Sequence, residues 1–450
     1  MISNHVDPPS APRYSPKALD LHAKLGKYVL AEGFPLYPDV ERSHGAYLYD
    51  TKSNQEFLDL FSFFVTQPLG FNHPKLATDE FKQKLGRFAV HRPTLSDVYT
   101  PEYVSFVETF ARVAGRGYFE HYFFVEGGAL GVENTLKVAF DWKVRKNLAK
   151  GRGEKGHQII HFREAFHGRS GYTVSMTNTF DPNKHQYFAK FSWPRVTNPK
   201  LRFPVTNQVL DETIAAEKRS VAEIEKAVHD HPDDIAALII EPIQSEGGDN
   251  HFRPEFLKEL RRLADEHDFL LIFDEVQTGI GLTGKMWAFE HFGVVPDLIA
   301  FGKKVQVGGC LSTTRVDEVK DNVFHMHSRI NSTWGGNLVD MIRSERYLQI
   351  IEEDRLVENV ANVGEYFLAR LNDWAQERPR ISNVRGRGLL MAFDLPDTAT
   401  RDLLRNRLFE NQLMILGCGP KSLRIRPHLD FTRENADRAM ELLTKTERLI

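Results

Sequence analysis

The middle of the chain alternates short apolar runs with longer amphipathic stretches, and this pattern limits the possible folds more than any other feature. The apolar runs have the length of buried strands and lie at Tyr122–Val125, Ile159–Phe162, Ala236–Ile240, Phe269–Phe273 and Leu298–Phe301. Residues 132–144 and Pro254–His267 repeat apolar side chains at helical spacing. Strands that alternate with helices form βαβ units, so we expect an α/β fold with a mostly parallel central sheet.

The pattern changes after about Asn337. Two long helical patterns are followed by short strand-like pieces, at Leu338–Ile351, Val357–Arg378, Gly388–Phe393 and Ser422–Ile425. This mixture predicts a smaller α+β domain at the C-terminus. We therefore expect three parts: an N-terminal segment (1–75) that packs with the small domain, a large domain (76–337) and the small domain (338–450).

Composition excludes several classes of protein. The chain has 450 residues and a formal net charge of −3, so no overall basic field favours nucleic acid. The longest apolar runs are too short to span a bilayer. Met1–Pro16 contains four prolines and no apolar signal-peptide core, which predicts a tail rather than a secretory signal. Only two cysteines, Cys310 and Cys418, are present, which fits a reducing cytoplasm.

Polar residues follow two of the predicted strands. Asp274 ends the run Phe269–Phe273, and Lys303 follows Leu298–Phe301 after one glycine. The carboxyl ends of parallel strands converge on one crevice, so we expect these side chains to meet there. A lysine that forms a Schiff base and an acid that keeps a ring nitrogen protonated are what pyridoxal phosphate requires. Lys304 is adjacent, and only one of the two lysines is expected to face the crevice.

Two further segments follow predicted strands. Gly128 and Ala129 lie at the start of a predicted helix, where backbone N–H groups bind phosphate, although strand–glycine–helix turns are also common packing geometry. Phe166 is able to stack on a flat ring and Arg169 to bind a carboxylate. The alternative for this second segment is a buried phenylalanine and a surface arginine.

Three more segments carry polar side chains in suggestive places. Glu246 lies in a loop with Glu241 and Gln244, which forms either the rim of a site or a solvated turn. Gln277, three residues after Asp274, is able to bond a phenolic oxygen. Thr333 lies in a glycine-rich turn before a helix, where its hydroxyl serves either a phosphate or a helix cap.

The last candidates are arginines and histidines. Alternation along a strand directs Arg424 and Arg426 to the same face, where one of them is able to bind a substrate carboxylate. His325 and His327 are two residues apart, but no third metal ligand can be placed near them from the sequence. We therefore expect no metal site.

As an ordered set, these segments resemble the class III (ω-) aminotransferases of the fold-type-I pyridoxal-phosphate superfamily, from about Pro35 to the C-terminus. The strings that carry the resemblance are FFVEGGALGVEN, FHGRSGYT, EPIQSEGGD, HFRPEF, IFDEVQTG, AFGKK and NSTWGGN. Within this family, the similarity is greatest to the members that transfer the ε-amino group of L-lysine to 2-oxoglutarate. The products of that reaction are 2-aminoadipate 6-semialdehyde, which cyclises to piperideine-6-carboxylate, and L-glutamate.

The resemblance implies a role for each candidate residue. Lys303 forms the Schiff base and moves the proton, Asp274 holds the ring nitrogen, Gln277 the phenolic oxygen, and Phe166 stacks on the ring. Gly128 and Ala129 bind the phosphate, together with Thr333 from the other subunit of a homodimer with shared active sites. Arg169, Glu246 and Arg424 bind the substrates, with Glu246 covering Arg424 when the donor is a terminal amine.

Three rival functions remain at this stage. Another ω-aminotransferase, of the 4-aminobutyrate or ornithine type, would use the same Lys303, Asp274 and Arg169. A dinucleotide oxidoreductase is disfavoured because no G-x-G-x-x-G follows an early strand. A binding module without catalytic activity is also possible, since a fold does not determine a function.

Overall fold

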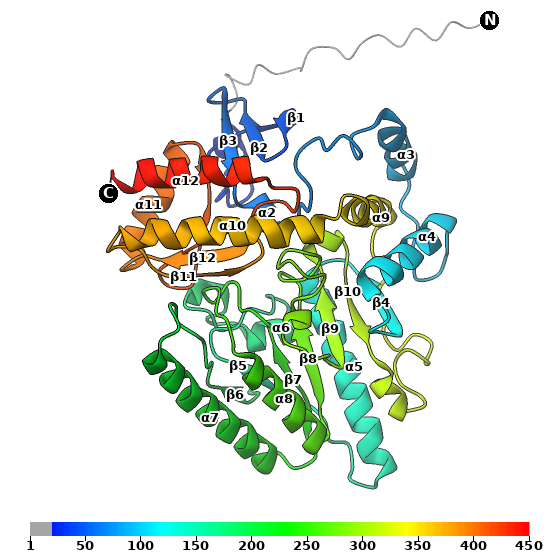
Figure 1. The fold of residues 1–450 in the computed structure, drawn as a ribbon. Coiled ribbons are helices and arrows are strands. Elements are labelled where there is room, and N and C mark those ends of the chain that lie inside the picture. The colour runs from blue at the N-terminus through cyan, green and yellow to red at the C-terminus, as the bar shows by residue number, and fades with distance from the viewer. Residues whose placement is uncertain (1–19, 450) are drawn as a thin grey trace, which may run out of the picture.

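The computed structural model describes residues 20–449 (Figure 1), so the tail predicted at Met1–Pro16 lies outside the described residues. Its largest sheet has seven strands. Their spatial order is β4 (His121–Val125), β10 (Gly308–Ser312), β9 (Leu298–Phe301), β8 (Leu270–Asp274), β7 (Ile235–Ile240), β5 (Gln158–Phe162) and β6 (Arg195–Val196). Strands β9, β8, β7, β5 and β6 pair in parallel, so the expected mostly parallel sheet is confirmed.

Strand β10 is the exception, since it pairs antiparallel with both β4 and β9. It was missed in the sequence because Gly308-Gly309 has the composition of a turn. The glycines are required by close backbone packing instead. A Cβ on Gly308 would lie 2.2 Å from the carbonyl oxygen of Gly127, and one on Gly309 would lie 2.1 Å from that of Phe123.

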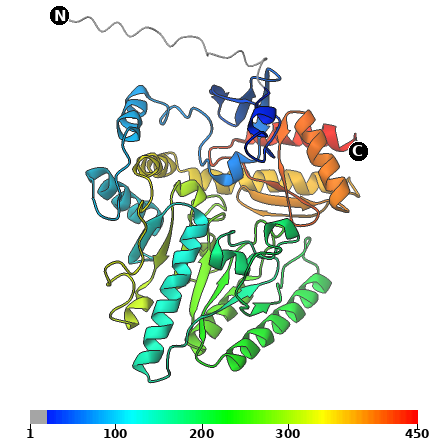
Figure 2. The same ribbon diagram turned by 180° about the vertical axis from the view of Figure 1, so that it is seen from behind.

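Helices cover both faces of this sheet, as the two opposite views show (Figures 1 and 2). Alternate residues of β7 face opposite ways: Leu238 packs in the core on one side and Ile239 in the core on the other. Helix α8 (Pro254–Glu266) covers the first side and α5 (Gly128–Ala149) the second. Burial on both faces explains why the strands are apolar throughout. The remaining α-helices between residues 20 and 337 are α1 (Leu21–Leu25), α3 (Asp79–Ala89), α4 (Pro101–Phe110), α6 (Gly171–Met176) and α7 (Asn207–Asp230), and the label α2 marks a left-handed turn (Ser62–Val65).

Two four-stranded sheets lie above the large sheet in Figure 1. One contains β1 (Pro38–His44), β2 (Tyr47–Asp50), β3 (Gln55–Asp59) and β13 (Leu413–Met414), and the other β11 (Ser382–Arg387), β12 (Leu390–Asp394), β15 (Ser422–Ile425) and β14 (Leu416–Cys418). The helices of this part are α9 (Leu338–Glu353), α10 (Leu356–Gln376), α11 (Thr398–Glu410) and α12 (Arg433–Glu447). Because β3 pairs with β13, the N-terminal segment shares a sheet with the C-terminal part. The division at residues 75 and 337 stays a prediction.

None of the helices between residues 20 and 449 combines the length and the apolar character needed to cross a membrane.

Candidate active site

A cavity of about 690 Å³ opens at the carboxyl ends of the parallel strands. Asp274 reaches it from the end of β8, Lys303 from the turn after β9, and Gly128 and Ala129 from the start of α5. The structure thus confirms that Asp274 and Lys303, predicted at the ends of neighbouring strands, line the same cavity. The predicted site residues that line the cavity are Gly128, Ala129, Phe166, Arg169, Glu246, Asp274, Gln277, Lys303 and Arg424.

The structure distinguishes the two adjacent lysines. Lys303 lines the cavity, and burial, followed by the charge of Arg424, lowers its pKa to about 8 against the opposite pull of Asp274. Its backbone is left-handed, with φ +50°, an uncommon conformation for a residue other than glycine. Lys304 is turned away: its buried Nζ donates to the carbonyl oxygen of Gln277 at 2.8 Å. The candidate nucleophile is therefore Lys303.

Asp274 is held by a partner that the sequence did not reveal. Nδ1 of His167 donates to Asp274 Oδ2 at 2.8 Å, and the N–H of Val276 donates to Oδ1 at 3.1 Å. Both His167 and Asp274 are buried. His167 lies in the Phe-His-Gly-Arg string, but nothing local to that string indicates contact with β8, because β7 separates β5 from β8.

The loop after β7 is buried rather than solvated. Glu241 accepts hydrogen bonds from the N–H groups of Phe166 at 2.9 Å and Ser245 at 3.1 Å, and burial raises its pKa to about 7. Gln244 is fully buried and bonds the Asn250 side chain at 2.9 Å. These contacts exclude the solvated-turn alternative and fix the position from which Glu246 enters the cavity.

The start of α5 is suited to an anion. Its N-cap residue is Gly127, which adopts φ +86° and provides no side chain to satisfy the first N–H groups of the helix. A Cβ on Gly128 would lie 2.6 Å from Val276 Cγ1. Free N–H groups at a helix N-terminus, reached without side-chain obstruction, form a phosphate-binding geometry.

Glu246 is shared by two cations. Its Oε2 accepts a bond of 3.0 Å from Nη1 of buried Arg424, and its Oε1 pairs with Nζ of Lys184. Burial alone would raise the pKa of Glu246, but the charges of Arg424 and Lys184 bring it below its usual value. Lys184 comes from a 3-10 turn, Pro182–Lys184, in a loop where the sequence carried no signal.

The other two arginines have different environments. Arg426 follows the end of β15 and is bound by the buried carboxylate of Asp249, so it is not available to a substrate. Arg169 is exposed at the cavity, and within residues 20–449 its side chain has no ion-pair partner. Of the strand pair considered from the sequence, Arg424 is the one that lines the cavity, and Arg169 provides a second, unpaired positive charge.

A strained turn delivers one more aromatic ring to the cavity. Residues 62–65 all have positive φ, between 42° and 68°. Left-handed conformation costs about 1–2 kcal/mol per residue for amino acids other than glycine. The turn places the ring of Phe64 with its centroid 6.0 Å from Lys303 Nζ and 5.9 Å from Arg424 Cζ. Such strain is concentrated at functional sites, and no feature of the Ser-Phe-Phe-Val sequence indicates it.

Comparisons with known proteins agree with this geometry. The model of the family "Aminotransferase class-III" matches residues 30–446. The chain belongs to the class-III aminotransferases. L-lysine-epsilon aminotransferase of Mycobacterium tuberculosis is 48% identical over 425 residues, which cover 93% of each chain. The mitochondrial 4-aminobutyrate aminotransferase of Mus musculus is 32% identical over 447 residues, covering 94% of this chain and 87% of the relative.

A solved structure gives the same relationship. Lysine aminotransferase from M. tuberculosis has a TM-score of 0.93 and 46% identity, covering 95% of this chain and 98% of that chain. The expected fold type I is therefore confirmed. Pyridoxal phosphate is the cofactor of class-III aminotransferases, so the cofactor expectation is also confirmed.

The residues present fit this cofactor. The uncapped start of α5 suits its phosphate, buried Asp274 its ring nitrogen, and Lys303 its carbonyl carbon. Thr333 is the one predicted site residue that does not line the cavity of its own chain; it is exposed in the turn before α9.

Proposed function

We propose that this class-III aminotransferase transfers the ε-amino group of L-lysine to 2-oxoglutarate. The products are L-glutamate and 2-aminoadipate 6-semialdehyde, which cyclises to piperideine-6-carboxylate. The observation that carries the proposal is the Glu246–Arg424 pair beside Lys303. The positive charge of Arg424 is neutralised by Glu246 when no substrate is bound. Such a site suits an enzyme whose donor lacks a carboxylate at the reacting carbon and whose acceptor has one.

The donor half-reaction leaves the ion pair intact. The ε-carbon of lysine bears no carboxylate, and a bare Arg424 would be a buried, unpaired charge beside it. Glu246 removes that cost. The α-carboxylate of lysine, at the other end of the substrate, binds Arg169, whose guanidinium has no ion-pair partner within residues 20–449.

The acceptor half-reaction exchanges partners. The α-carboxylate of 2-oxoglutarate binds Arg424, and its γ-carboxylate binds Arg169. For this to occur, the ion pair between Glu246 and Arg424 must break. Lys184 already bonds the other oxygen of Glu246, so the displaced carboxylate retains a cation. Two cations that share one carboxylate make the exchange possible without an unpaired buried charge.

The chain's own residues divide the remaining work. When bound, pyridoxal phosphate supplies a reactive carbonyl carbon and an electron sink. Asp274, oriented by His167, would stabilise a proton on the ring nitrogen, and Gln277 would bond the phenolic oxygen. Phe166 would pack on the ring, and Gly128 and Ala129 would hold the phosphate. Nζ of Lys303, whose pKa is lowered to about 8, would accept the proton from the ε-carbon of lysine.

A substrate panel tests the proposal. With 2-oxoglutarate as acceptor, glutamate formation should be fastest with L-lysine and at least about tenfold slower with 4-aminobutyrate or L-ornithine, because Arg169 is positioned for the carboxylate of one donor length. Nα-acetyl-lysine tests whether the α-amino group contributes. Preference for 4-aminobutyrate or ornithine would contradict the lysine assignment and leave the reaction class intact.

We also propose that the enzyme is a cytoplasmic homodimer in which Thr333 of each chain completes the phosphate site of its partner. Exposure of Thr333 supports this proposal, as does exposure of the large apolar side chains of Tyr187 and Phe188, which follow the cavity-lining Lys184 by three and four residues. Large exposed apolar side chains of this kind favour a protein interface.

Mixed dimers test the sharing of sites. A Lys303→Ala chain paired with a Thr333→Ala chain should have one fully intact site if Thr333 acts across the interface, and no intact site if it acts within its own chain. Recovery of activity on mixing two impaired variants is therefore expected. The absence of recovery, with dimers formed as judged by light scattering, would contradict it.

A further inference from the structure

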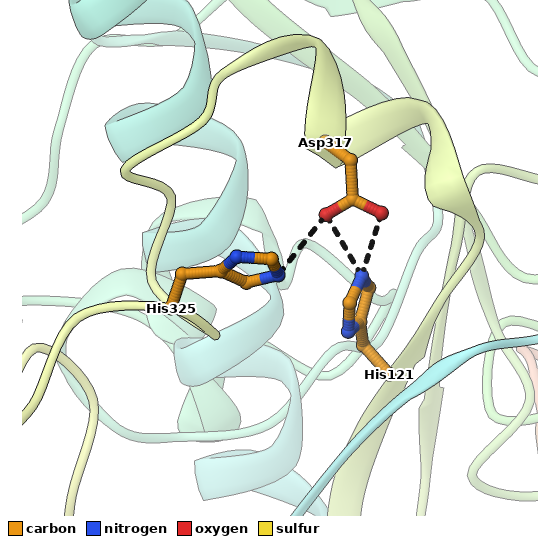
Figure 3. A group of neighbouring side chains, drawn as sticks. All are labelled: His121, Asp317 and His325. Atoms are coloured by element: carbon orange, nitrogen blue, oxygen red, sulfur yellow. Dashed lines mark hydrogen bonds and ion pairs between the residues drawn. The ribbon is translucent and has the colours of Figure 1, made fainter.

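Three potential metal ligands, His121, Asp317 and His325, lie side by side (Figure 3), and none of them lines the active-site cavity. His121 is the first residue of β4, Asp317 lies in the 3-10 helix Thr314–Glu318, and His325 lies in the loop that follows. Because β4 runs from His121 towards Gly127, the cluster is at the opposite end of that strand from the phosphate-binding turn. None of the three has a role in the proposed transamination.

The ligand atoms already converge. Nε2 of His121 is 2.9 Å from both carboxylate oxygens of Asp317, and Nε2 of His325 is 3.4 Å from Oδ1. One ligand atom from each residue lies within 4.8 Å of the other two. Ligands bound at about 2.0–2.1 Å in a tetrahedral zinc site are separated by about 3.3 Å. The His121–Asp317 and Asp317–His325 separations therefore differ from this value by only a few tenths of an ångström.

Neighbouring residues hold the ligands in place. Nδ2 of Asn322 donates to Asp317 Oδ1 at 3.0 Å and to the carbonyl oxygen of Val316 at 3.2 Å. Asn322 is buried, and its own carbonyl oxygen accepts the N–H of His325 at 3.0 Å. The ring of His121 stacks on Phe324, with centroids 4.8 Å apart and planes at 11°. Secondary contacts of this kind orient metal ligands and strengthen binding.

We propose that His121, Asp317 and His325 bind one divalent transition-metal ion, with water completing the coordination. Two imidazoles and one carboxylate favour Zn²⁺, Co²⁺ or Ni²⁺ over Mg²⁺ or Ca²⁺, which prefer oxygen ligands. Partial exposure of the three side chains, at 18%, 33% and 48%, leaves room for water ligands. The ion ties the edge strand β4 to the segment that leads on to Thr333.

The structure also explains why no local sequence pattern indicated this site. His325 and His327 suggested a pair, but His327 bonds Ser328 and is not part of the cluster. The partners of His325 come from elsewhere: Asp317 is eight residues away, and His121 is 196 residues from Asp317. We expected no metal site because the sequence placed no third ligand near the histidines. The fold brings two ligands, His121 and Asp317, to His325.

Zinc binding to the holoenzyme tests the proposal. The chain should carry no affinity tag, and free amino acids should be removed so that the cofactor does not chelate zinc with them. Calorimetric titration with Zn²⁺ should give one site per chain with a micromolar dissociation constant. The affinity should fall by about tenfold or more in His325→Ala and in Asp317→Asn. His327→Ala is the matched control and should bind as the wild type does.

Two results would overturn the proposal. One is the lack of a stoichiometric zinc site in the wild-type holoenzyme. The other is an equal loss of affinity in His325→Ala and His327→Ala, which would indicate nonspecific binding by surface histidines. His325 is exposed, so its replacement should leave folding unchanged, and circular dichroism checks this. Visible absorption bands of bound Co²⁺, lost in His325→Ala and retained in His327→Ala, provide an independent readout.

Discussion

The two sides of the active-site cavity are built differently. On the cofactor side, Asp274 and Lys303 stand at the ends of buried parallel strands, and Asp274 keeps fixed partners. The substrate side is assembled from three separate elements. Glu246 lies in the loop after β7, Arg424 in β15 and Lys184 in a 3-10 turn. There a single carboxylate is shared by two cations.

We infer from this difference that the cofactor side determines the class of reaction and the substrate side determines the substrate specificity. A strand end in a covered sheet cannot move without disturbing the core, so Asp274 and Lys303, the groups proposed to act on the ring nitrogen and the proton, are held in place. Ion pairs between side chains of separate elements exchange partners at much lower cost, which a pocket that accepts two substrates in turn requires. Variants on the cofactor side should therefore affect both half-reactions, and variants on the substrate side should affect them unequally.

The largest effect is expected from Lys303→Ala. Loss of both the covalent link to the cofactor and the proton-transfer group should lower kcat by at least about a thousandfold in both half-reactions. The visible absorption band of the lysine-linked cofactor should also disappear. Lys304→Met is the matched control, because the Lys304 amine contacts only the Gln277 carbonyl among the hydrogen bonds of the described chain. A persisting band in Lys303→Ala would assign the link to Lys304.

Glu246→Ala should separate the two half-reactions. Removal of the carboxylate leaves Arg424 as a buried, unpaired charge when lysine is bound, so kcat/KM for lysine should fall by about tenfold or more. The half-reaction with glutamate supplies its own carboxylate and should change little. Asp211→Ala removes an exposed acid of α7 that does not line the cavity and serves as the control. Equal losses in both single-turnover rates would refute the exchange of partners.

The rate of cofactor binding to the apoenzyme should depend on pH through Lys303. The neutral amine is the reactive form, and its fraction rises with pH up to the pKa, which burial lowers to about 8. The rate of pyridoxal phosphate incorporation should therefore rise by about tenfold per pH unit below that value and level off above it. Stopped-flow absorbance measures this rate. A rise that continues towards pH 10 would show that the amine is not desolvated.

Lys184→Met should give the smallest effect, and it should act differently on the KM for 2-oxoglutarate and on the KM for lysine. Without Lys184, Glu246 is held by Arg424 alone, so 2-oxoglutarate displaces it less easily. The KM for 2-oxoglutarate should rise by about two- to fivefold, the range expected for a partly exposed ion pair. The KM for lysine should stay unchanged or fall slightly. Lys190→Met, in the same loop, provides the control, and parallel changes in both KM values would argue for a general structural effect.

Much of the large sheet follows from local sequence. The run Leu298–Phe301 is β9 as predicted, and Pro254–His267 corresponds to α8 within one residue. Strand β10 was missed, because the glycines that permit close packing also resemble a turn. The left-handed turn at residues 62–65 was missed because strain of that kind depends on surrounding contacts rather than on local preference.

The sequence by itself determined which residues stand at the ends of the buried strands, and so identified Asp274 and Lys303 as partners. A polar residue directly after a buried parallel strand has only the crevice at the sheet edge to occupy. Only the tertiary structure decided that Lys303 rather than Lys304 faces the cavity, that His167 supports Asp274, that Lys184 shares Glu246 and that His121 lies beside His325. Those contacts join segments far apart in the chain, and their geometry depends on strand order and loop paths that no local pattern specifies.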